Sequence, residues 1–586
     1  MVVANQETIA TLLRKKTAEE AYNYICASVP KQEDKQLAAE FNAVAQQLFM
    51  AGHTSPAISL LMRLLRAMPE QVSFKNNIGF CIAHGVFSEP DSNVRTAIID
   101  ALKETWAPER ELVRGAISYL KLDHAQLFFQ MGQQGVDLFA RFIGDPLTLA
   151  ALGYVLPDRD IEWLLTEIRK RYLNLVAHSG SLSAPDRLFL ARLGCHCFVN
   201  EFIYDVDEDE AALLSSLTGP SVDRLLIAAC YGPLPDSPES GDSLFKDILE
   251  FQIRQPRMEI ALGADIPRLT TISDEVSRKV QEHYEEHPYP RWERLPVSIR
   301  QTTVPAEMAR RFPGATISLP ENARILIAGC GTGQQSLYLA RQFPKSQILA
   351  IDFSAASLRY ALRKTKEAGI GNIEYAQADI LELDKGLGPF DYIVCAGVLH
   401  HMRDPNAGLM RLLDLLSNRG VIELGLYSEA ARKCVVAAKE LILENGFSTE
   451  IEAIRRCRRT ILALPEFHPA RACASSADFY SASGCRDLIF HHQETRYDLP
   501  RVRTMIAEAG CELVGFSPSP KVASLYLSRH PTDKRMAIID NWERLEQEIP
   551  TLFSEMYHFV LQKKRSEPEQ PFRLFSPISA SFGQGY

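Results

Sequence analysis

The sequence has no stretch approaching the ~18 consecutive apolar residues that a membrane span requires. Its 12 cysteines are scattered singly, apart from Cys195 and Cys197, and they form no CxxC pair and no Cys/His cluster at zinc spacing. The net charge of −9 leaves no excess of cations to neutralise phosphates. These absences argue against a membrane span, a disulfide framework, a metal site and a nucleic-acid partner. Because the first residues also lack a signal-peptide layout, we expect a cytoplasmic protein.

One stretch of the sequence has the pattern of a nucleotide-binding βαβ unit. The apolar segment 324–328 leads into the run GCGTG at 329–333, then a helical pattern, then a second apolar segment that ends on Asp352. Glycines let the backbone approach a ligand closely, and an acid at the end of the second strand can accept both hydroxyls of a ribose. The candidate binding residues are Gly329, Gly331, Thr332, Gly333, Asp352 and Phe353.

The glycine spacing distinguishes between nucleotides, because a dinucleotide fold would place its third glycine where Gln334 stands. The GxGxG turn, Asp352, and Asp379 after a third apolar segment at 372–376 together resemble the class I S-adenosylmethionine-dependent methyltransferases. The resemblance implies S-adenosyl-L-methionine as cofactor, with its methionine end at the glycine turn and its adenine beside Asp379 and Ile380. The alternative is a Rossmann domain that binds another nucleotide or none.

The same resemblance implies an α/β Rossmann-like domain with a mostly parallel seven-stranded sheet. Apolar segments at 390–397, 420–427, 512–516 and 557–562 supply the remaining strands. The methyltransferase domain would then comprise 301–429 and 499–563, with a mainly helical insert at 430–498 that shapes the substrate site. The basic run at 455–459 within this insert is interpreted as a solvated helix face. We expect the tail at 564–586 to be flexible.

The region before this domain is helical in pattern. Residues 38–69 fit one tetratricopeptide repeat, so 1–125 is predicted to be a tetratricopeptide-like domain, and 126–275 a second all-helical region. An ordinary helical hairpin is the alternative. With the runs YEEHPYPRW, GVLHHM and SGCRDLIFHHQE, the chain resembles bacterial tetratricopeptide-repeat-containing class I methyltransferases.

A proline- and aromatic-rich segment at 276–300 is predicted to be an extended strap, because its two prolines at 288 and 290 disfavour helix. Many class I enzymes carry an acid two residues before the first glycine, but Ile327 stands there. We therefore expect Glu285 or Glu286 to meet the cofactor's ammonium, while the strap closes over the pocket. A strap that only docks the helical half is the alternative.

Methyl transfer from a sulfonium is an in-line displacement that needs alignment more than acid–base catalysis. His400 and His401, at the end of the fourth strand, stand where the acceptor should arrive and are the catalytic candidates. Further candidates for the substrate pocket are Tyr289, Trp292, Tyr427, Glu429, Tyr480, Arg486, Asp487 and His491.

Three functions are consistent with these patterns. The first is a protein methyltransferase that modifies a side-chain nitrogen of a polypeptide held by the N-terminal helices. The second is a small-molecule methyltransferase whose helices form a lid or dimerise. The third is a non-enzymatic, cofactor-binding scaffold, which the intact glycine turn with Asp352 and Asp379 disfavours.

Overall fold

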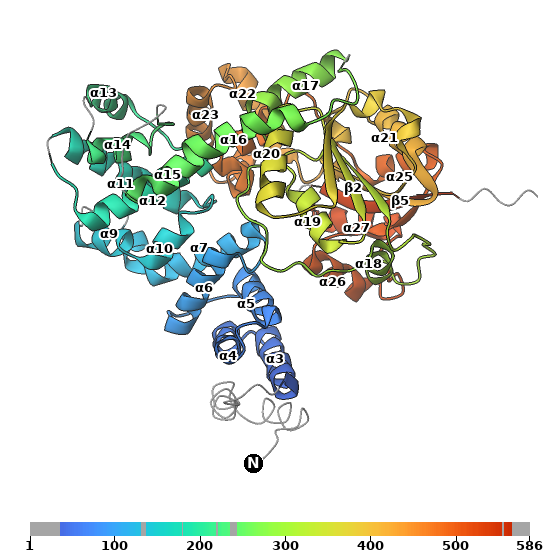
Figure 1. Ribbon diagram of the computed structural model, residues 1–586, viewed down its shortest axis with the longest axis horizontal. Coiled ribbons are helices and arrows are strands. Elements are labelled where there is room, and N and C mark those ends of the chain that lie inside the picture. Colours follow the sequence, from blue (N-terminus) through green and yellow to red (C-terminus); the bar gives the residue numbers. More distant parts are fainter. Residues whose placement is uncertain are drawn as a thin grey trace, which may run out of the picture.

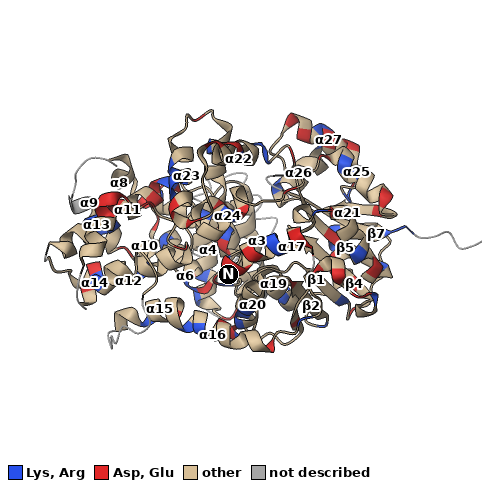
Figure 2. Ribbon diagram, turned by 90° about the horizontal axis from the view of Figure 1, so that it is seen from above, with Lys and Arg blue, Asp and Glu red and all other residues tan. Residues whose placement is uncertain are grey.

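The computed structural model describes residues 35–564, except 131–135, 179, 218–220, 235–242, 273 and 554–555. The tail predicted at 564–586 therefore lies outside the described residues, apart from Lys564, as does the beginning of the predicted helical domain. Among the described helices, none is long and apolar enough to cross a membrane. Figure 2 shows basic and acidic residues interspersed along the ribbon.

A seven-stranded sheet forms the C-terminal half, with strand order β3-β2-β1-β4-β5-β7-β6. The first five strands are parallel, and β7 runs antiparallel between β5 and β6. All seven predicted strands are confirmed, because each is a buried apolar run ended by a turn. The strands are β1 (Arg324–Ala328), β2 (Gln347–Asp352), β3 (Ile373–Gln377), β4 (Phe390–Ala396), β5 (Leu416–Tyr427), β6 (Cys511–Phe516) and β7 (Met556–Lys563).

Helices cover both faces of this sheet and create two apolar layers. One layer packs α18 (Val304–Arg311), α19 (Gln334–Gln342) and α20 (Ala355–Glu367) against the sheet. The other packs α21 (Pro405–Leu415), α25 (Leu499–Glu508), α26 (Pro520–Arg529) and α27 (Ile539–Glu548). The carboxyl ends of the parallel strands remain open between the layers, where ligands bind in sheets of this kind. The sequence did not predict α26, and it placed the start of α27 five residues too early.

The N-terminal half is helical, as predicted, and its first helices project away from the sheet (Figure 1). Residues 38–69 correspond to a hairpin whose inward side chains, among them Phe41, Leu48 and Leu61, are buried. Its tetratricopeptide character stays a prediction. The hairpin and the helices that follow it are α3 (Lys35–Met50), α4 (Thr54–Ala67), α5 (Val72–His84), α6 (Ser92–Glu104), α7 (Glu109–Asp123), α8 (Ala125–Phe129) and α9 (Val136–Ile143). The rest are α10 (Pro146–Ala151), α11 (Arg159–Ala177), α12 (Ala184–Val199), α13 (Glu208–Ser216), α14 (Val222–Ala228), α15 (Lys246–Leu249) and α16 (Gln255–Leu262).

The insert after β5 packs onto this helical half. It consists of α22 (Lys433–Asn445), α23 (Ile451–Ala463), α24 (Ala482–Ile489) and the short 3₁₀ helices η7 (Pro469–Ser475) and η8 (Ala477–Tyr480). Its buried side chains belong to the same apolar cluster as those of the N-terminal helices. The insert is therefore helical, as predicted, and joins the two halves of the chain.

This packing corrects the interpretation of the basic run 455–459 as a solvated helix face. Arg458 is 2% exposed, and its guanidinium donates to both carboxylate oxygens of Glu162 on α11, at 2.9 and 2.7 Å. Arg455 donates to the carbonyl of Phe202. Only part of the run faces solvent, because the insert lies against the helical half.

We predict that Arg458→Ala lowers the free energy of unfolding by about 3–5 kcal/mol, because Glu162 would be left as a buried, unpaired charge. Arg459 is a matched control on the same helix: its side chain is 55% exposed and pairs with Asp205 at the surface. Its replacement by alanine should cost about 0–1 kcal/mol. Urea unfolding measures both variants, and equal losses would contradict a buried pair between insert and helical half.

Candidate functional site

A cavity of about 290 Å³ lies at the carboxyl ends of β1, β2 and β4. The sheet, α17 (Glu275–Glu286), the segment after α17, the helical half and the insert all contribute to its wall. The charged residues of the wall are Asp352, Asp379, Asp478, Asp487, Arg110 and Arg432.

The glycine turn is shaped by close contacts that side chains would block. Gly331 has a φ of +52°, and a Cβ placed there would lie 2.6 Å from the carbonyl oxygen of Tyr289. Its amide donates to Asp352 Oδ2 at 2.8 Å, which ties the turn to the end of β2. Gly329 and Gly331 line the cavity, whereas Thr332 and Gly333 do not. Gly333 is the N-cap of α19, and the Thr332 hydroxyl donates to the Pro290 carbonyl.

The acid at the end of β2 is buried and lines the cavity with Phe353. Burial raises the pKa of Asp352 to about 6, although the amides of Ser354 and Gly331 donate to its carboxylate and oppose the shift. The carboxylate has two lone pairs on each oxygen, so it can accept further hydrogen bonds from a diol.

Asp379 and Ile380, which the resemblance places beside the adenine, line the cavity after β3. Asp379 Oδ1 accepts from the amide of Leu381, whereas its buried Oδ2 has no hydrogen-bond partner among the described residues. An amino group in the cavity would satisfy this oxygen. The glycine turn, Asp352 and Asp379 therefore fit a nucleoside with a diol at one point and an amine at another.

The structure corrects the prediction of an extended strap beginning at 276. Residues 275–286 form α17, and the chain is extended only over 287–303, hereafter the extended segment. Glu285 and Glu286 do not line the cavity. The Glu285 carboxylate accepts from the Ala356 amide at 3.0 Å and pairs with Arg359, so it caps α20 instead. The Glu286 side chain is 72% exposed.

The extended segment passes directly over the glycine turn. Tyr289 and Pro290 line the cavity, and the Trp292 indole donates to the Thr332 carbonyl at 3.1 Å. Trp292 itself lies outside the main cavity and borders a smaller one of about 70 Å³. Tyr289 and Pro290, and not the predicted acids Glu285 and Glu286, are therefore the residues with which this segment borders the cavity.

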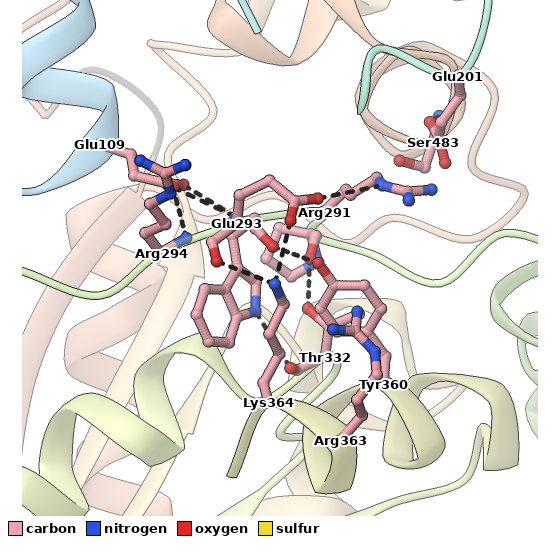
Figure 3. A network of polar contacts seen from close by, with 12 residues as sticks. Glu109, Glu201, Arg291, Glu293, Arg294, Thr332, Tyr360, Arg363, Lys364 and Ser483 are labelled. Carbon is pink, nitrogen blue, oxygen red and sulfur yellow. Dashed lines mark hydrogen bonds and ion pairs between the residues drawn. The ribbon is translucent and has the colours of Figure 1, made fainter. Parts of the chain in front are cut away.

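Polar contacts hold this segment between the two halves of the protein (Figure 3). Glu293 is buried and forms an ion pair with Lys364 of α20 at 3.0 Å. From the other side, Glu109 of α7 accepts from the backbone amides of Glu293 and Arg294, at 3.3 and 2.6 Å. Burial and the nearby Glu293 charge raise the pKa of Glu109 to about 7.

The two histidines after β4 differ in position. His401 lines the cavity, whereas His400 is fully buried beneath it with its ring 3.7 Å from that of Tyr427. His401 Nδ1 lies 2.8 Å from the Gln493 carbonyl, which can only accept, so the neutral ring presents Nε2 as an acceptor. Burial lowers the pKa of His401 to about 4, although that carbonyl contact opposes the shift. The imidazole is therefore neutral at physiological pH.

The remaining pocket candidates divide into two groups. Tyr289, Tyr427 and Asp487 line the cavity. Glu429 is exposed, His491 stacks on His401 at 3.7 Å behind the wall, and Tyr480 and Arg486 donate to carbonyls of the insert. These four do not line the cavity.

Among the charged and aromatic residues of the wall, four were not predicted candidates: Arg110, Tyr284, Arg432 and Asp478. The Tyr284 hydroxyl donates to Asp487 at 2.5 Å, and Arg432 pairs with Glu494 at 2.8 Å. Arg110 comes from the helical half, where no local motif marks it. Only the fold brings it to the site.

Residues 325–420 match the family model described as a methyltransferase domain. The chain carries a class I, S-adenosylmethionine-dependent methyltransferase domain. Its match covers the glycine turn, Asp352 and Asp379, so the residues of the site that fit a nucleoside are those of the matched domain. The cofactor predicted from the sequence is confirmed.

Relatives extend the similarity beyond this domain only in part. An uncharacterised protein of Synechococcus is 29% identical over 50% of this chain and 73% of its own length. A trans-aconitate 2-methyltransferase of Deinococcus radiodurans is 31% identical over 28% of this chain and 61% of its own length. PKMT2 from Rickettsia typhi, solved with AdoHcy, is 20% identical over 45% of this chain and 53% of its own, with a TM-score of 0.36.

Asp352 supplies a direct test of the cofactor site. Because charge-assisted hydrogen bonds are worth roughly 1.5–3 kcal/mol, Asp352→Ala should weaken binding of S-adenosylhomocysteine about tenfold to a hundredfold. Since protonation removes the acceptor charge, wild-type affinity should also fall as the pH drops below about 6. Isothermal titration measures both effects, with the exposed Asp384→Ala as control. A loss below about threefold would mean that the ribose is held elsewhere.

Proposed function

We propose that this protein transfers a methyl group from S-adenosylmethionine to a side-chain nitrogen of a polypeptide. The supporting observation is the charge of the cavity wall. Beyond Asp352 and Asp379, which suit the cofactor, the wall carries Asp478 and Asp487 with Arg110 and Arg432. Arg110 pairs with Asp478, and Arg432 pairs with Glu494 outside the wall, so Asp487 is the remaining acid for an acceptor. Tyr284 and Tyr289 add aromatic rings, whose faces attract cations. Such a wall favours a cationic amine over a carboxylate acceptor.

When bound, S-adenosylmethionine supplies an electrophilic methyl group on a sulfonium. The residues of the chain position the acceptor and exclude water, which accounts for most of the acceleration in this kind of displacement. His401 is neutral with Nε2 as acceptor, so it can orient an amine through an N–H hydrogen bond. With a pKa of about 4, it is too weak a base to take a proton from an ammonium ion, so the amine loses its proton to solvent before it attacks the methyl group.

The N-terminal helices support a polypeptide as the carrier of that nitrogen. Large apolar side chains are exposed around α3 to α5, including Met50, Phe80 and Val86, at 83%, 48% and 82%. These helices extend from the body of the protein (Figure 1). Exposed apolar side chains on a projecting arm are suited to binding another chain.

A small-molecule acceptor is the second candidate. It is favoured by relatives such as the trans-aconitate 2-methyltransferase, which acts on a small carboxylate. The helices would then serve as a lid or a dimerisation module. The acidic wall of the cavity disfavours an anionic acceptor of that kind.

Labelled S-adenosylmethionine, incubated with the protein and a lysate of the source organism, distinguishes these candidates. We expect label in the acid-precipitable fraction that is released by protease, survives alkali and appears as a methylated basic amino acid after hydrolysis. Label only in small molecules would contradict the polypeptide acceptor, and alkali-labile label would contradict nitrogen. The Asp352→Ala variant provides the background.

Phe80→Asp tests the role of the projecting helices. It should reduce label in protein, because a charge disrupts an apolar contact, while leaving S-adenosylhomocysteine binding unchanged. Met258→Asp, at a 46% exposed position on α16, is the matched control and should have no effect. Equal labelling by both variants would show that the arm does not receive the substrate.

His401 variants separate orientation from proton abstraction. Glutamine can accept a hydrogen bond but is not basic, so His401→Gln should retain most of the methylation rate if the imidazole only orients the acceptor. A loss of about 100-fold or more in His401→Gln, as in His401→Ala, would indicate a general base. Single-turnover rates on the labelled protein substrate measure the difference.

A further inference from the structure

An ion pair lies in the wall of the cavity, on the side of the glycine turn. Arg110, in the first turn of α7, donates to Asp478 Oδ1 of η8 at 2.6 Å. Both residues line the main cavity and also the smaller cavity of about 70 Å³. Three further residues line both: Tyr289, Pro290 and Gln334. Gln334 begins α19 immediately after the glycine turn, and Gly331 packs against Tyr289. The pair therefore lies next to the turn.

The methionine end of S-adenosylmethionine carries an ammonium and a carboxylate. The first strand offers no acid for this group, because Ile327 is 1% exposed and belongs to the apolar layer that includes Trp292. Glu285 and Glu286 lie outside the cavity. Of the other aspartates in the wall, Asp352 and Asp379 occupy the ends of β2 and β3, which suit the ribose and the adenine. Asp487 accepts a hydrogen bond from the Tyr284 hydroxyl, and it does not border the smaller cavity beside the glycine turn.

We propose that Asp478 and Arg110 bind the ammonium and the carboxylate of the cofactor's methionine end. The inference rests on the proposed function, and it assigns two residues from outside the methyltransferase domain to the cofactor site. A guanidinium has five donors in a planar fork and can hold two carboxylates at once. The Asp478 side chain is 8% exposed, so its charge is largely desolvated, and its contact with Arg110 uses only one oxygen. Charge-assisted bonds to Asp478 are strong in such a setting, whereas the Arg110 side chain is 56% exposed.

This assignment has a structural consequence. Arg110 belongs to the helical half and Asp478 to the insert, so the cofactor would contact all three parts of the protein. Cofactor binding would then require the helical half to stay docked in the position in which the extended segment and the insert hold it.

Two ligands that differ only at the methionine end test the proposal. 5′-Methylthioadenosine keeps the adenosine and the sulfur but lacks the amino-carboxylate of S-adenosylhomocysteine. By isothermal titration, Arg110→Gln and Asp478→Asn should each weaken S-adenosylhomocysteine about tenfold to a hundredfold, as expected for a lost charge-assisted bond. The affinity for 5′-methylthioadenosine should stay within about twofold. Arg114→Ala, on the exposed side of α7, is the control and should change neither affinity.

A double exchange, Arg110→Asp with Asp478→Arg, guards against a purely structural pair. The exchange restores an ion pair between the helical half and the insert, so any contribution of the pair to their docking is kept. It places each charge opposite the wrong group of the ligand's amino-carboxylate end. We expect melting temperature to recover and S-adenosylhomocysteine affinity to remain low. Recovery of that affinity, unchanged affinity in the single variants, or an equal loss for both ligands would overturn the proposal. If the wild type binds neither ligand, the cofactor site itself is wrong, and the proposed function falls with it.

Discussion

The extended segment 287–303 is the constraint on which the site depends. Its backbone is held by Glu109 of the helical half, and its Glu293 pairs with Lys364 of the methyltransferase domain. The same segment places the Tyr289 carbonyl against Gly331, where any side chain would collide. The shape of the cofactor turn is thus linked to the docking of helices more than 200 residues away in sequence. Buried charges make this link sensitive to the loss of either partner.

The insert at 430–498 has a matching role on the other side of the cavity. It interrupts the methyltransferase domain, yet its apolar side chains pack with the N-terminal helices. Arg458 and Glu162 form a buried ion pair across that contact. Asp478 and Asp487 of this insert line the cavity, so the pocket is assembled from three parts of the chain. This architecture explains why four of the six charged wall residues, Arg110, Arg432, Asp478 and Asp487, lie outside the matched domain.

The sequence predicted the features that depend on residues close to one another along the chain. The seven strands, the glycine turn, Asp352 and Asp379 follow from apolar runs, breaks and acids at fixed places, and the structure has each of them where expected. It could not predict contacts between distant segments. Arg110 and Asp478 come into contact only after folding. Arg458 is buried because α23 packs against the helical half, a contact that the sequence around Arg458 does not indicate. Glu285 caps α20 instead of facing the cavity.

Hydrogen–deuterium exchange with and without S-adenosylhomocysteine tests most directly whether three parts of the chain build one cofactor site. The account predicts that the ligand protects the start of α7 and the segments 287–295 and 477–481, together with the glycine turn at 329–335. Protection confined to the methyltransferase domain would contradict it, because the helical half and the insert would then have no part in holding the cofactor.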